Sequence, residues 1–185
     1  MRLLFILNIK CKRPVSQTGR HCLQCIFSSG RSIRHNRCNA LIKRALQSAG
    51  FPATLEPSGL FTDGRRPDGI TQIPWENGRF LAWDFSCVDP LSPSNINKDI
   101  LKYTEDFKRN KYVDIPDEYK FVPVVTTTLT SLGSQALSLI KKIGRTLRTK
   151  SGDPKEGVYL RQRIGIQIIK SNFTCFIGSF PGEPD

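Results

Sequence analysis

Apolar residues recur every three to four positions in four stretches of the chain, and this spacing predicts four helices. The first stretch covers residues 39–50, where Leu41, Ile42, Ala45 and Leu46 carry the pattern. Gly50 and Pro52 end it, because glycine and proline commonly terminate helices. The other three predicted helices cover residues 97–112, 134–147 and 158–169.

Short apolar runs between turn residues predict four strands, over residues 53–56, 66–73, 79–88 and 121–127. The third run is almost continuously apolar, which is typical of a strand buried on both faces, but Asp84 interrupts it. Glu76-Asn-Gly78 precedes it as a hairpin turn, and Pro123 indicates an edge or a bulge in the fourth strand. The order is helix, three strands, helix, strand and two helices. It predicts an α/β fold with a mixed sheet and helices on both faces.

The first 38 residues lack this periodicity and have a different composition. Cys11, Cys22, Cys25 and Cys38 alternate with His21 and His35. Clustered Cys and His favour metal binding over a disulfide framework, and a metal would supply folding energy that so small a core lacks. We therefore divide the chain into a Cys/His-rich segment (1–38), a central unit (39–128) and a helical tail (129–185).

The net charge of +12 is unevenly distributed along the 185 residues. Residues 1–50 contain ten Lys/Arg and no acid, and residues 141–170 contain nine Lys/Arg and two acids. Twelve of the sixteen acids lie between them, in residues 51–140. Basic flanks favour a polyanion such as nucleic acid or an anionic membrane surface, the alternative being a merely solvated surface. No apolar stretch is long enough for a transmembrane helix, so we expect no membrane partner.

Three acids fall on the three consecutive predicted strands, namely Glu56, Asp68 and Asp84. On neighbouring strands their carboxylates can converge, and converging carboxylates need a cation between them. Mg²⁺ or Mn²⁺ suits such oxygen ligands and activates a bound water. Lys108 and Lys111 on the following helix are candidates to orient that water. The alternative is that these acids are ordinary surface residues.

The spacing of Arg66-Pro67-Asp68 and Trp83-Asp84 resembles the PD-(D/E)XK signature of restriction-enzyme-like nucleases. Over roughly residues 11–127 the chain also resembles the endonuclease region downstream of the reverse transcriptase in site-specific non-LTR retrotransposons. The segments that carry this wider resemblance are Gly19-Arg-His-Cys-Leu-Gln-Cys25, Arg34-His35, Asn39, Leu55-Glu-Pro57, Arg65-Arg-Pro-Asp-Gly69, Trp83-Asp84 and Lys108-Arg-Asn-Lys-Tyr112.

This resemblance implies a restriction-endonuclease-like αβββαβ core and a nuclear enzyme that nicks DNA with Mg²⁺ or Mn²⁺, without a small-molecule cofactor. Asp68 and Asp84 match the metal-binding acids, and Glu56 matches an acid on the preceding strand. The signature lysine belongs at position 86, where this chain has Ser86, so Lys108 or Lys111 would replace it. The chain has no reverse transcriptase, so we expect a truncated element copy or a separately expressed nuclease.

The same family carries a zinc knuckle before the nuclease core. Cys11, His21 and Cys25 match three of its ligands, but Ile9 stands where the first Cys belongs. Structural zinc takes four ligands, so Cys22 or His35 would have to substitute, or the zinc site is lost.

Candidate DNA contacts are the loop residues Arg65 and Arg66, the family-matched Tyr112, and the basic face of the helix over 134–147, with Lys141, Lys142 and Arg145. Each basic residue can equally belong to a solvated surface. The main functional hypothesis is a metal-dependent endonuclease. The alternatives are a DNA-binding remnant without catalysis and a degenerate fragment that does not fold.

Overall fold

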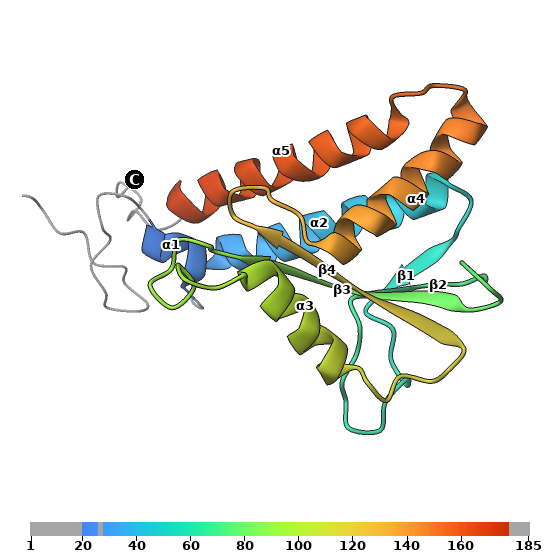
Figure 1. Ribbon diagram of the computed structural model, residues 1–185, viewed down its shortest axis with the longest axis horizontal. Helices are drawn as coiled ribbons and strands as arrows, with labels where there is room; N and C mark the ends of the chain where they lie inside the picture. The colour runs from blue at the N-terminus through green and yellow to red at the C-terminus, as the bar shows by residue number, and fades with distance from the viewer. Residues whose placement is uncertain (1–19, 26–27, 178–185) are drawn as a thin grey trace, which may run out of the picture.

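The computed structural model describes residues 20–25 and 28–177 of the chain. A four-stranded sheet lies between α3 on one face and α2, α4 and α5 on the other (Figure 1). The helices are α1 (Arg20–Gln24), α2 (Ser29–Ser48), α3 (Ile100–Lys111), α4 (Ser134–Ser151) and α5 (Glu156–Ile177). The strands are β1 (Ala53–Leu55), β2 (Gly69–Thr71), β3 (Phe80–Val88) and β4 (Tyr119–Thr127). The predicted α/β class, the four strands and the order of the elements are confirmed.

The strands lie side by side in the order β1-β2-β3-β4. The first two pairings are antiparallel, and β4 runs parallel to β3 because α3 carries the chain back across the sheet. Pro123 lies on β4 at the sheet edge, as predicted, where a missing N–H is tolerated. Asn77 and Gly78 both have positive φ angles (51° and 75°), so the predicted hairpin turn before β3 is also confirmed.

The main hydrophobic cluster lies on one face of the sheet. Leu81, Trp83 and Phe85 alternate along β3 and pack with Val122 and Val124 of β4. Four residues of α4 join this core: Ala136, Leu139, Ile140 and Ile143. Trp83 is fully buried, and an added Cβ at Gly69 would lie 2.1 Å from its ring. Gly69 therefore leaves the room that the indole occupies.

Helix α2 begins at Ser29, so the prediction of a helix starting at residue 39 was wrong. Its first half packs through side chains that carry no apolar pattern. Arg34 is 2% exposed, and its guanidinium donates to Asn172 Oδ1 on α5 (2.7 Å) and to the carbonyl of Leu23 (3.2 Å). Because the polar residue Arg34 fills an inward position, hydrophobic periodicity could not reveal the first part of α2.

The other helices agree better with the sequence, although α4 and α5 both extend past the predicted ends. At the α4–α5 crossing, an added Cβ at Gly144 would lie 2.5 Å from Gly157 Cα, so two glycines let these backbones approach. In the described part of the chain, no helix combines the length and the hydropathy needed to cross a membrane.

Candidate active site

Asp84 lies on the face of β3 opposite the hydrophobic core, beneath α3. It is 3% exposed, and its carboxylate is held from α3 by two side chains. Lys108 Nζ lies 2.6 Å from Oδ1, and the Tyr112 hydroxyl donates to Oδ2 at 2.8 Å. Lys111 Nζ lies further away, 3.9 Å from Oδ2. A buried carboxylate is tolerated only with such partners, so α3 supplies the charge compensation that β3 lacks.

Tyr112 follows the last residue of α3 and is 1% exposed. Its hydroxyl also lies 2.6 Å from the carbonyl of Arg66, and its ring packs on Phe121. Burial, together with the charge of Asp84, raises the pKa of Tyr112, so the phenol stays protonated and keeps donating. The prediction that Tyr112 contacts DNA is therefore corrected: a side chain this buried positions Asp84 and does not face a ligand.

Asp68 stands directly before β2. The last pair of the β2–β3 ladder joins Gly69 to Trp83, so Asp68 and Asp84 each stand one residue beyond it. The N–H of Phe85 donates to Asp68 Oδ2 at 2.6 Å, which brings this carboxylate to the residue after Asp84. The two acids therefore lie close together at the end of the β2–β3 ladder.

His35 of α2 completes the surroundings of Asp68, with Nε2 2.9 Å from Oδ2. The hydrogen bond to Asp68 raises the pKa of His35 against the effect of burial. Burial alone would raise the pKa of Asp68, but the hydrogen bond and charge of His35 outweigh it and lower that pKa. Asp84 also raises the pKa of His35, and Asp68 also raises that of Tyr112. Each acid thus acts on the partner of the other.

Glu56 does not join the two aspartates. Its side chain is 57% exposed and forms an ion pair with Arg66, with Oε2 2.9 Å from the guanidinium. Within the described residues, no three His, Cys, Asp or Glu side chains gather where they could hold a metal ion. The expected convergence of three carboxylates is thus reduced to the pair Asp68 and Asp84.

Arg65 forms ion pairs within the protein, and its predicted contact with DNA stays a prediction. Its guanidinium binds the carboxylates of Asp114 and Asp63 and the carbonyl of Lys111, and it lies over the Phe61 ring. The hydrogen bonds to Asp114 and then to Asp63 raise the pKa of Arg65, and the contact with Asp114 ties the β1–β2 loop to the segment after α3. Arg66 is more exposed (56%), although Glu56 neutralises it.

The three predicted basic residues of α4 lie away from the acids, because α4 packs on the core face of the sheet (Figure 1). Lys142 Nζ lies 2.5 Å from Glu76, which also pairs with Lys120. The hydrogen bond from Lys120 and then that from Lys142 lower the pKa of Glu76 to about 2. Glu76 is therefore ionised and neutralises the charge of Lys142. Lys141 and Arg145 are exposed and line a groove between α4 and α5 together with Arg148 and Arg161. All three lie apart from the two acids, and their predicted contact with DNA stays a prediction.

No Cys/His group able to hold a metal ion is found among the described residues, which do not include Cys11, so the zinc site stays a prediction. Cys11 lies outside the described residues, and Cys25 is 5% exposed. His35 binds Asp68 from α2, so its candidate role as a zinc ligand is corrected to a role beside the acids.

Two residues, His35 and Asn39, were not predicted as partners of the acids. Asn39 lies one turn after His35 on α2 and is within 3.3 Å of the His35 ring, while its Oδ1 accepts from Trp83 Nε1 at 3.0 Å. The spacing of His35 and Asn39 is the signal that could have identified them, had the helix been extended back to Ser29.

No protein-family model matches the chain, and a search of the curated proteins finds no relative. The site combines two adjacent carboxylates, and Lys108 forms an ion pair with one of them, Asp84. Mg²⁺ is commonly held by one or two carboxylates and several waters, so Asp68 and Asp84 fit such an ion.

Proposed function

We propose that this protein is a metal-dependent DNA endonuclease of the restriction-enzyme-like class, related to the endonuclease region of site-specific non-LTR retrotransposons. The observation that carries the proposal is the pair of acids at the end of the β2–β3 ladder, Asp68 and Asp84, with Lys108 bound to Asp84. The order α2-β1-β2-β3-α3-β4 supports it, because it is the αβββαβ order that the resemblance implies. Nuclear localisation is part of the same proposal.

In this proposal Asp68 and Asp84 hold Mg²⁺ or Mn²⁺. The ion, when bound, supplies an activated water and stabilises charge on the phosphate. Lys108 then orients the attacking water beside Asp84, the task that a lysine at position 86 would have. Hydrolysis breaks one P–O bond and leaves a 5′-phosphate and a 3′-hydroxyl.

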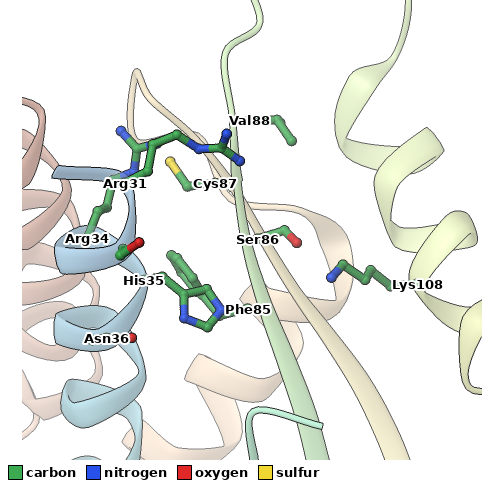
Figure 2. Close-up of a pocket in the computed structure, with 10 residues that line it drawn as sticks. Arg31, Arg34, His35, Asn36, Phe85, Ser86, Cys87, Val88 and Lys108 are labelled. Atoms are coloured by element: carbon green, nitrogen blue, oxygen red, sulfur yellow. The ribbon is translucent and has the colours of Figure 1, made fainter. Parts of the chain in front are cut away.

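The position of the Lys108 side chain supports the proposal that it replaces the lysine expected at position 86. Ser86 and Lys108 line the same pocket, so a lysine from β3 and a lysine from α3 would deliver an ammonium to the same space (Figure 2). Lys108 is only 17% exposed, whereas Lys111 is 37% exposed and further from Asp84. Of the two candidate lysines, Lys108 therefore fits the water-orienting role, and Lys111 fits a contact with the phosphate backbone.

Nicking of supercoiled plasmid in Mg²⁺ or Mn²⁺ tests the proposal. We expect Asp68→Asn and Asp84→Asn to lose nicking, while Glu56→Gln, whose carboxylate faces Arg66, keeps it. Lys108→Ala should lose about two to four orders of magnitude in rate, and Ser86→Lys added to Lys108→Ala should restore part of it. Circular dichroism of each variant controls for folding. Equal nicking by the wild type and both aspartate variants would refute the assignment.

One observation favours a second candidate, a DNA-binding protein without catalysis. Both acids already have a cationic partner in the protein, Lys108 for Asp84 and His35 for Asp68. A site neutralised in this way does not need a metal. This candidate predicts salt-dependent gel shifts and no cleavage in Mg²⁺ or Mn²⁺.

A further inference from the structure

Beyond Asp84, no strand of the described residues pairs with one of the edges of β3. Strand β2 begins at Gly69, which pairs with Trp83, whereas β3 continues to Val88. The first backbone donor past the end of β2, the N–H of Phe85, binds the carboxylate of Asp68 instead of a strand. The edge of β3 that follows therefore opens beside the candidate acids.

A pocket of about 430 Å³ lies along this edge, between α2 and α3. Figure 2 shows residues of α2 on one side of the strand and Lys108 on the other, with Ser86 and Cys87 between them. Its volume is within the range of small-molecule sites and is sufficient for one nucleotide. The partners of both acids, His35 and Lys108, line it.

The lining of this pocket is basic. Arg31, Arg34, His35 and Lys108 contribute to it, and among the described residues no carboxylate does. His35 and Lys108 are balanced by the acids that they bind. Arg34 and the exposed Arg31 line the same wall. An anion placed there would meet cations from α2 and from α3.

Arg34 gives the strongest indication of an anionic ligand. It is 2% exposed, and the side-chain groups that it binds within the described structure are the amide oxygen of Asn172 and the sulfur of Cys175. A buried guanidinium usually faces a carboxylate, and burying a charge without one is costly. Arg34 also donates to the carbonyl of Leu23, but in the described part of the chain it has no ion pair with an acid, so no carboxylate offsets its charge there.

We propose that this pocket is a phosphate subsite, which binds the nucleotide next to the cleaved bond through Arg31 and Arg34. The inference rests on the proposed nuclease function for the identity of the ligand. Arg34 supplies a fixed buried charge, and the exposed Arg31 supplies direct contact with the phosphate. The subsite then sets the position of the strand relative to Asp68 and Asp84.

Binding without metal tests the subsite separately from catalysis. Thymidine 5′-monophosphate, thymidine and inorganic phosphate are titrated into the full chain in EDTA and followed by NMR or calorimetry. We expect the monophosphate to bind more tightly than either thymidine or phosphate. Arg31→Ala should weaken its binding about tenfold, the usual scale for a hydrogen bond to a charged group, and Arg31→Lys should weaken it less.

Arg37→Ala is the matched control, since Arg37 is an exposed arginine of α2 that does not line the pocket. Equal losses in Arg31→Ala and Arg37→Ala, or thymidine binding as tightly as its monophosphate, would overturn the subsite. Plasmid nicking is measured in parallel. Selective loss of monophosphate binding in a protein that does not nick supports the subsite and refutes catalysis. Intact binding in a nicking Arg31→Ala variant does the opposite.

Discussion

The two faces of β3 differ in chemistry although they belong to one strand. Leu81, Trp83 and Phe85 face the helices α2, α4 and α5 in an apolar core, whereas Asp84 faces α3 and is held by Lys108 and Tyr112. Both faces are buried, but only the first is stabilised mainly by the removal of apolar surface from water. The second buries charge at a cost that ion pairing offsets. Burial alone therefore does not show which face serves stability and which serves chemistry.

The largest expected effect lies on the apolar face. Trp83→Ala should lower the free energy of unfolding by about 3–5 kcal/mol, because it removes a fully buried indole and its hydrogen bond to Asn39. Urea denaturation measures this loss. Trp75→Ala, at a partly buried side chain, is the control and should cost clearly less. Equal losses of unfolding free energy in the two variants would contradict the larger contribution expected of Trp83.

On the polar face, Asp84→Ala should cost about 3 kcal/mol, because it leaves the poorly exposed Lys108 ammonium without its ion-pair partner and removes one acceptor of the buried Tyr112 phenol. Replacing both charges, with Asp84→Leu and Lys108→Met, should recover much of that loss. A double-mutant cycle in urea measures the coupling. Strict additivity of the single changes would show that the two charges do not stabilise each other.

Next is the pH dependence of the His35–Asp68 pair. The pKa of His35 is raised above 6.5, so its stabilising contribution is complete below about pH 6.5 and is lost as the pH rises through the folded pKa. The pKa of Asp68 is lowered below 3.8, so its contribution is present above pH 3.8 and is lost as the pH falls through the folded pKa. The urea midpoint of the wild type should therefore fall on the alkaline side of pH 6.5. His35→Gln should flatten that part of the curve, and an unchanged slope would contradict the pairing.

The smallest effect is expected at Glu56, whose ion pair with Arg66 is more than half exposed on both sides. Glu56→Gln should change the free energy of unfolding by about 0–1 kcal/mol, because water and salt screen such pairs. Thermal unfolding at low and at high salt measures it. A loss approaching that of Asp84→Ala would show that Glu56 belongs to the buried site.

Period and turn residues were sufficient to predict the strands and the crossover helix. The strand order grouped Asp68 and Asp84 with Glu56, the resemblance singled out the two aspartates, and both left Lys108 and Lys111 as alternatives. It could not predict the partners of residues whose role depends on tertiary packing. Tyr112, Arg65 and Lys142 look like surface groups in a linear pattern, yet their partners Asp84, Asp114 and Glu76 lie far away in the chain. Similarly, the start of α2 was missed because Arg34 fills an inward position.

The attachment of Lys108 to α3 has a consequence for motion. A lysine on β3 would be fixed by the sheet, but a lysine on α3 keeps its place only while this one helix stays docked. Because few of its residues are buried, α3 can open locally without unfolding the sheet. Such an opening would withdraw the ammonium and the Tyr112 hydroxyl from Asp84 together. Hydrogen exchange of α3 amides should therefore follow the rate of nicking more closely than it follows global stability.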